Sequence, residues 1–288
     1  MNATVLDFHP LEPLARDLME RALEPHILLG MPHLTPFGLS ETWLMKELGH
    51  RHWLMLARQL GMNNADFRTA DGEEAYAAIC ATSLSNARFE TVRANDILTI
   101  RSLLTPVSRT QVSTRHRLAV RGMTIGEVEL ISTFVCRMRE GDNYSIARVA
   151  MPQLKETTPC EVNALATLAS AVRSNKAAVC LGLSTDELKT RRSYRFEPDQ
   201  TQEFNGAGLF YFAQFQAVAD RASEKWFSRL QGLLALRERR VFFRGNVRAG
   251  ETLSVDLVGV SDDHLRLHCV IRRSDGTVIG NVFTRYGS

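Results

Sequence analysis

Cysteine is scarce in this sequence, and its placement argues against two common uses. The 288 residues include five cysteines, an odd number, and no pair is spaced as Cys-x-x-Cys. The sequence therefore predicts neither a disulfide framework nor a metal site. Reduced thiols in a cytoplasm are the simplest interpretation, because disulfides persist mainly in oxidising compartments. The five are Cys80, Cys136, Cys160, Cys180 and Cys269.

Long apolar runs and strong charge are also missing. No apolar stretch approaches the roughly 20 residues that a membrane-spanning helix needs, and residues 1–7 lack a basic region followed by an apolar one. The formal net charge is only +3, with Lys and Arg scattered along the chain. These features argue against a membrane protein and against nucleic acid as the main partner, although an anionic small molecule still fits. We therefore expect a cytoplasmic protein.

Familiar catalytic and nucleotide-binding motifs are absent as well. The sequence has no P-loop, no dinucleotide fingerprint, no Gly-x-Ser-x-Gly and no zinc-hydrolase motif. Any catalytic residues must therefore lie outside these known motifs.

An internal repeat is the most informative feature that is present. Residues 92–100 (VRANDILTI) return as residues 247–255 (VRAGETLSV), an offset of 247 − 92 = 155 residues, and residues 120–128 are echoed by 273–282. A repeat of this size is too long for a solenoid unit and fits a duplicated domain. Two similar halves would meet at a pseudo-symmetric interface, which is a common place for a ligand.

Each half has the same order of predicted elements, a long helix followed by antiparallel strands. In the first half Ser40 is an N-cap for a helix that runs to Leu60 and stops at Gly61. In the second half the glycine-rich residues 205–208 open a helix that extends to Leu234. Segments with alternating polarity and many β-branched residues predict strands at 99–104, 111–120, 126–138, 241–247, 252–260, 265–272 and 277–285.

This pattern divides the chain into three parts. We expect a first unit at residues 1–150, a connecting segment at 151–200 and a second unit at 201–288. The connection should contain an alanine-rich helix over 161–176 and a strand around 194–196, and should wrap the outside of the sheet. The expected fold class is α+β.

Two segments resemble those of the hot-dog fold, in which a sheet wraps a central helix. One is the predicted start of the second helix, and the other is the turn that precedes a long strand. The residues concerned are 206–212 (GAGLFYF) and 248–253 (RAGETL), and a turn like the second occurs in both halves. Two such units imply a double hot-dog. Thioesterases of this fold carry an Asp just before a Gly-Val-Val-Tyr-like helix start, where this chain has Asn205. Because Asn cannot take a proton at neutral pH, hydrolysis by that mechanism is disfavoured.

Three longer segments resemble a narrower group, the double hot-dog acyltransferase/decarboxylase of leinamycin-type polyketide biosynthesis and related biosynthetic proteins. They are residues 38–53, 71–78 and 205–212. The resemblance implies decarboxylation of a malonyl-type thioester and transfer of the acyl group from coenzyme A to an acyl carrier protein. It implies that this transfer passes through an acyl-tyrosine at Tyr76. Acyl-CoA and a carrier protein would be partners, a homodimer is compatible with the resemblance, and no cofactor is needed besides the thioester substrate.

The second helix start is the expected place for the thioester oxygen. The first N–H groups of a helix lack partners within it and lie at the positive end of its dipole, and glycines let a ligand approach closely. One well-placed donor is worth ~3–4 kcal/mol to a developing oxyanion. Alternatively, the glycines only allow tight packing and the Asn only caps the helix. The residues are Asn205, Gly206, Ala207, Gly208 and Leu209.

Tyr76 and the start of the first helix complete the predicted site. A tyrosine pKa near 10 leaves little phenolate, so Tyr76 would need a nearby donor or cation; the alternative is a tyrosine packed on the core. Ser40 and Glu41 would contact substrate, or would serve only as N-cap and first-turn residues. His50 and His52 cannot share a helix face, and structural roles are favoured for both.

Three functions remain open on these grounds. The first is an enzyme that decarboxylates or transfers a malonyl-type acyl group, with Tyr76 and the Asn205 helix start in one site between the halves. The second is a protein that binds a carrier-bound acyl chain without catalysis, and the third is a hot-dog thioesterase. Basic residues in 191–192 and 237–240 would meet the phosphates of coenzyme A or simply lie at the surface.

Overall fold

The computed structural model describes residues 12–108, 110–150, 162–176, 178–185, 189–227 and 234–287 of the chain. Cys160 and residues 228–233 of the second predicted helix lie outside this part. Within it, no helix is long and apolar enough to cross a membrane.

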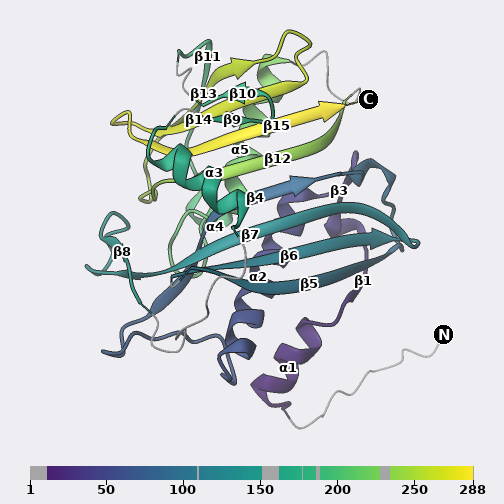
Figure 1. Cartoon of the computed structure of the whole chain (residues 1–288), viewed down its shortest axis with the longest axis vertical. Helices are drawn as coiled ribbons and strands as arrows, with labels where there is room; N and C mark the ends of the chain where they lie inside the picture. The colour runs from purple at the N-terminus through teal and green to yellow at the C-terminus, as the bar shows by residue number, and fades with distance from the viewer. Residues whose placement is uncertain are drawn as a thin grey trace, which may run out of the picture.

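In the first half a long central helix, α2, lies behind a strongly twisted antiparallel sheet (Figure 1). The strands follow the spatial order β1-β5-β6-β7-β4, and β8 pairs with the end of β7. The elements are α1 (Ala15–Ala22), β1 (His26–Leu28), a 3-10 turn (Met31–His33), β2 (Leu34–Thr35), β3 (Gly38–Leu39), α2 (Glu41–Gln59), β4 (Ala75–Ser85), a second 3-10 turn (Phe89–Thr91), β5 (Ile97–Ser108), β6 (Gln111–Val120), β7 (Met123–Arg137) and β8 (Ile146–Arg148).

The second half repeats this arrangement, with α5 as its central helix and the strand order β12-β15-β14-β13-β11. The elements after the first half are α3 (Ala164–Arg173), β9 (Val179–Cys180), β10 (Leu183–Ser184), β11 (Arg192–Phe196), α4 (Gln200–Glu203), α5 (Ala213–Trp226), β12 (Ala235–Phe243), β13 (Leu253–Val260), β14 (Arg266–Arg273) and β15 (Val278–Gly287).

The two halves join into one continuous sheet where β4 pairs antiparallel with β12; we call this pairing the seam. The strand order is symmetric about the seam, so that β5 and β13, which carry the first repeat, occupy equivalent positions. The duplication expected from the sequence is confirmed. Both central helices lie on the same face of the sheet and contact each other (Figure 1).

The repeated turn has the same geometry in both halves, which explains why it is legible in the sequence. Asn95 and Gly250 are equivalent and both adopt left-handed φ values, 69° and 75°. Asn tolerates this region better than most residues and Gly adopts it freely. In each copy a carboxylate just after this residue accepts a hydrogen bond from an arginine backbone amide just before it. The amide of Arg93 donates to Asp96 (2.8 Å), and that of Arg248 donates to Glu251 (3.1 Å).

The connecting segment covers the opposite face of the sheet from the central helices. In Figure 1, α3 crosses in front of the seam. Its buried residues Leu165, Ala169 and Val172 belong to the same apolar cluster as Ala81 of β4 and Phe242 of β12. The expected strand at 194–196 is present as part of β11, which pairs with β13 at the edge of the sheet. Of the connection, α3 thus packs outside the sheet as expected, whereas β11 is an edge strand of the sheet and does not wrap it.

Candidate active site

Four polar side chains from both halves meet where the two central helices adjoin the seam. We call Glu41, Asp220, Arg239 and Tyr286 the junction cluster; they come from α2, α5, β12 and β15 respectively. Nη1 of Arg239 donates to Oε2 of Glu41 (2.7 Å) and to Oδ2 of Asp220 (2.9 Å), and its Nη2 donates to Oδ1 of Asp220 (2.6 Å). The Tyr286 hydroxyl lies 3.4 Å from Oδ1 of Asp220. Arg239 of the second half thus binds the start of α2, the central helix of the first half.

The cluster is closed at one end and open at the other. The side chains of Arg239 and Glu41 are only 2% and 10% exposed, whereas that of Asp220 is 47% exposed. Asp220 is therefore the point at which this cluster meets solvent, and Glu41 is its buried end.

Burial raises the pKa of the Glu41 carboxyl to about 7, against the opposing attraction of Arg239 and with a further contribution from Asp220. Burial would by itself lower the pKa of Arg239, but the two carboxylates hold it above its ordinary value. The arginine therefore stays charged while Glu41 exists in both protonation states at neutral pH. A carboxyl poised in this way can take and return a proton during a reaction.

Two atoms of the junction cluster are buried without a hydrogen-bond partner among the described residues: Oε1 of Glu41 and Nε of Arg239. Buried polar groups in proteins are nearly always satisfied, so an exception calls for a water or a ligand group that completes it. Oε1 is the free oxygen of the carboxyl whose other oxygen is held by the arginine. Glu41 is thus held by one oxygen, and its other oxygen is buried without a partner among the described residues.

The positions related to Glu41 and Arg239 by the duplication carry no charge. Alignment of Gly126 with Gly280 makes Arg239 equivalent to Thr82, because these two residues pair with equivalent positions of β15 and β7. The first residue of α5 is Ala213, where α2 has Glu41. The pseudo-symmetric interface is therefore charged on one side only.

Tyr76 lies in β4 and is only 6% exposed. Its hydroxyl donates to Oε2 of Glu74 at 2.5 Å. Burial and then the Glu74 carboxylate raise the pKa of Tyr76 to about 12, while the nearby Arg137 opposes the shift. Arg137 is the nearby cation that a tyrosine nucleophile would need, yet the raised pKa keeps the phenol protonated.

The predicted helix start at Asn205 is wrong, because α5 begins at Ala213. Residues 205–209 form a closed turn instead, in which Oδ1 of Asn205 accepts the amides of Ala207 (3.1 Å) and Leu209 (3.0 Å). The amide of Gly208 donates to the Asn205 carbonyl (2.8 Å), and Gly208 has a left-handed φ of 69°. These three N–H groups already have partners within the turn.

Tyr76 and the 205–209 turn are linked through Arg137, but the expected common pocket for the Tyr76 hydroxyl and the amides of Ala207 to Leu209 stays a prediction. Nη2 of Arg137, whose charge acts on Tyr76, donates to the Ala207 carbonyl (2.6 Å), and Asn143 donates to that of Gly208 (2.8 Å). A Cβ added at Gly206 would meet no atom within 4 Å, and Gly206 adopts no left-handed φ, so the turn does not require glycine there.

The region around Tyr76 is separate from the junction cluster. The Tyr76 ring lies 6.5 Å from that of Trp53, which follows Glu41 by twelve residues in α2. Twelve helical residues span about 18 Å, so the structure places the predicted Tyr76 and Glu41 near opposite ends of the helix.

The remaining predicted residues of α2 have structural contacts. Oγ of Ser40 accepts the amide of Trp43 (3.2 Å), which is the expected N-cap. His52 is fully buried and bonded to Thr114 (2.8 Å) and Ser132 (2.7 Å), so the preference for a structural role agrees with its contacts. No group of three or more His, Cys, Asp or Glu side chains suited to a metal occurs in the part of the chain described.

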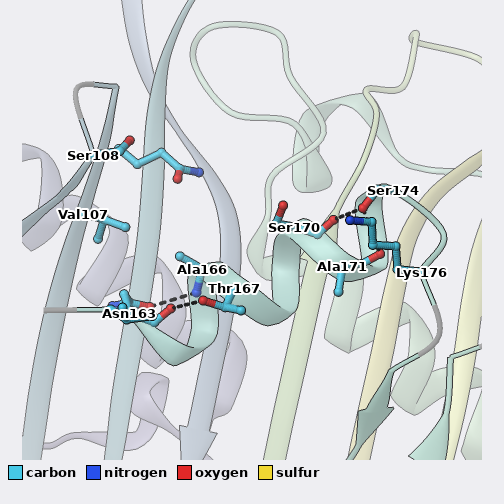
Figure 2. A pocket seen from close by; sticks show the side chains of 11 residues that line it. Val107, Ser108, Asn163, Ala166, Thr167, Ser170, Ala171, Ser174 and Lys176 are labelled. Carbon is cyan, nitrogen blue, oxygen red and sulfur yellow. Dashed lines mark hydrogen bonds between the residues drawn. The ribbon is translucent and has the colours of Figure 1, made fainter.

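A separate hollow of about 740 Å³ lies on the outer face, between α3 and the strands β5 and β6. Figure 2 shows Thr167, Ser170 and Ser174 of α3 and its flanks along this hollow, with the N-cap Asn163 at one end. Its lining contains hydroxyl and amide groups and the ammonium of Lys176, but no carboxylate or histidine. It therefore lacks the acid–base group that the junction cluster offers.

No protein-family model and no curated protein matches the sequence. Among solved structures, an acyl-ACP thioesterase from Bacteroides thetaiotaomicron has a TM-score of 0.61 at 10% identity and covers 91% of this chain and 96% of that one. The 12:0-ACP thioesterase from Umbellularia californica has a TM-score of 0.65 at 8% identity, with coverages of 91% and 95%. A protein assigned as an oleoyl thioesterase from Lactobacillus plantarum has a TM-score of 0.66 at 11% identity, with coverages of 91% and 94%.

The chain is a double hot-dog. The match extends over nearly the whole length of each of these proteins, so the duplicated architecture is shared and not just a single unit. At such low identities the likeness shows the fold alone. The chemistry must be inferred from the residues of this double hot-dog.

Sequence reasoning missed Asp220 and Arg239 as site residues. Arg239 is part of a basic run for which the sequence suggested phosphate binding, but its side chain is buried between two carboxylates. The one available signal was periodicity: an arginine at an inward position of a strand pattern needs a buried acidic partner.

Proposed function

We propose that this double hot-dog is an enzyme that cleaves an acyl thioester of coenzyme A or of an acyl carrier protein, with Glu41 as general acid and base. The observation that carries the proposal is the buried Glu41 carboxyl, held by Arg239 through one oxygen and free at the other. The sequence disfavoured hydrolysis because Asn205 replaces a carboxylate in the second half. Glu41 supplies a carboxylate at the start of the other central helix.

The proposed reaction is a general-base hydrolysis. Ionised Glu41 takes a proton from a water through Oε1 as the water oxygen attacks the thioester carbonyl carbon. The tetrahedral oxyanion then collapses and the carbon–sulfur bond breaks. The departing thiolate takes the proton from Glu41, which returns the carboxylate to its starting state. The products are a free acid and the thiol of the carrier.

Decarboxylation with acyl transfer is the second candidate. It is favoured by the position of Tyr76 beside Arg137, which also contacts the 205–209 turn. It is opposed by the raised pKa of Tyr76, because an acyl-tyrosine requires the phenol to lose its proton. In this candidate Tyr76→Phe abolishes transfer; in the proposed hydrolase it leaves thioester cleavage intact.

The first experiment identifies the products. Purified full-length protein is incubated with acetyl-, hexanoyl-, lauroyl- and methylmalonyl-CoA, with and without an acyl carrier protein, while free thiol, carbon dioxide and the carrier mass are followed. We expect thiol and free acid in equal amounts. Carbon dioxide release with carrier loading would establish the second candidate instead, and saturable binding without any turnover would show a binding protein.

Glu41→Gln then tests the residue. The substitution keeps the size of the side chain but removes the base, and we expect kcat/KM to fall about 10²–10⁴-fold. Glu47→Gln is a matched control on the same helix, since Glu47 contacts Arg51 and not the junction cluster. Full activity in Glu41→Gln would contradict the proposal.

A further inference from the structure

Gln216 of α5 is a second buried polar side chain with an unused group. It is 2% exposed, and its Nε2 has no hydrogen-bond partner among the described residues. Gln214 on the same helix is also buried, at 5%, but its Nε2 donates to the Gln202 carbonyl (3.5 Å). The contrast singles out Gln216.

The position of Gln216 on α5 directs it toward the junction cluster. It follows Ala213 by three residues and precedes Asp220 by four, so the three share a helix face. Ala213 packs into the core of the first half, and Asp220 bonds to Arg239. The neighbouring Phe215 packs into the core of the second half. Gln216 therefore lies on the side of α5 that meets α2 and the seam.

An unsatisfied buried amide is costly. Leaving such a donor unpaired costs about 1–3 kcal/mol, which an apolar side chain of similar size would avoid. Oε1 of Glu41 is a free acceptor, and Gln216 lies about one helical turn from Asp220, which shares Arg239 with Glu41. A thioester carbonyl accepts a hydrogen bond and an attacking water donates one, so the pair matches the two reacting groups.

We propose that Gln216 binds the thioester through its Nε2, which donates to the carbonyl oxygen and stabilises the oxyanion as water attacks. The inference rests on the proposed function and adds a second catalytic residue to it. The bonds formed and broken are those of the hydrolysis above: the oxyanion gathers charge at the oxygen nearest Gln216 while Glu41 holds the proton. The predicted donors of the 205–209 turn are thus replaced by a side chain of α5.

The test is a pair of matched substitutions, Gln216→Met and Gln214→Met. Loss of an oxyanion donor lowers kcat about 10²–10³-fold, with a smaller effect on KM. Because Nε2 of Gln216 has no partner in the free protein, Gln216→Met should leave the denaturation midpoint unchanged or raise it. Gln214→Met should do the opposite: it removes an existing hydrogen bond and lowers the midpoint, while kcat stays near the wild-type value.

The outcomes separate this inference from the proposed function. Wild-type turnover that depends on Glu41 but not on Gln216 overturns the inference alone. A Gln216→Met variant that loses both stability and activity shows a structural role and also overturns it. A wild-type protein without activity on any thioester overturns both.

Discussion

At the scale of single residues, the proposed chemistry depends on a balance between burial and charge at Glu41. Burial favours the protonated acid, and Arg239 favours the carboxylate, so that the pKa comes to about 7. Either influence alone would make the group a poor shuttle at neutral pH, because it would be always protonated or only weakly basic. The arginine therefore has two effects, on the orientation of Glu41 and on its proton affinity.

Removal of Arg239 should be among the most damaging changes in this protein. Arg239→Met leaves Glu41 buried beside Asp220 with no cation, and breaking a buried pair typically costs about 3–5 kcal/mol. We expect a loss near the lower value, because Asp220 is 47% exposed and partly screened by solvent. Urea unfolding measures the free energy. The double variant Glu41→Leu/Arg239→Met should recover part of the loss, and failure to recover any would contradict the pairing.

Buried histidines should make the protein sensitive to acid; His52, His116 and His268 are all at most 1% exposed, and burial lowers the pKa of each. Burial lowers the pKa of His52 and of His116 to about 3, and both are joined through Thr114. In the unfolded chain they titrate near 6.5, so below that pH the unfolded state binds more protons. The stabilisation is complete above pH 6.5 and is lost as the pH falls toward 3.

The measurement is the free energy of unfolding at several pH values between 7 and 4. His116→Gln should show a shallower fall than the wild type, because one titrating group is gone. The exposed His50 serves as control, and His50→Gln should retain the wild-type slope. Equal slopes in all three proteins would contradict the assignment.

At the scale of elements, the sequence predicted both central helices, but only one helix start. Ser40 is a cap that can be read directly, and α2 begins at the next residue. At Asn205 the same kind of side chain accepts two amides of a turn that closes on itself, and α5 begins eight residues later. Asn favours caps and turns alike, because it bonds to nearby backbone amides in both.

The contact between the central helices gives a sharp test of their packing. A Cβ at Gly49 of α2 would lie 2.7 Å from Cε1 of Phe212, so Gly49→Ala must displace the ring. Overpacking costs about 1–3 kcal/mol, and the better helix propensity of Ala returns about 1 kcal/mol, so we expect a net loss of about 1 kcal/mol. Gly206→Ala is the control and should be neutral. Thermal unfolding of Gly49→Ala at or above the wild-type midpoint would refute this packing.

At the scale of the whole molecule, the duplication could be detected in the sequence because its turns require a backbone geometry that few residues adopt. Asn95 and Gly250 both adopt left-handed φ values, and strand order about the seam follows from two equal units. The asymmetric placement of the charged residues could not be predicted from the sequence. It depends on Arg239 meeting Glu41 across 198 residues of chain, a juxtaposition that arises only when β4 pairs with β12.

The pH dependence of thioester cleavage tests the central claim most directly. An acyl-N-acetylcysteamine is suitable as substrate because it has no phosphate that titrates. A general base must be deprotonated in the free enzyme, so kcat/KM of the wild type should rise with pH and level off above an inflection near 7. Residual cleavage by Glu41→Gln should lack that inflection. The same inflection in Glu41→Gln, or none in the wild type, would contradict Glu41 as the base.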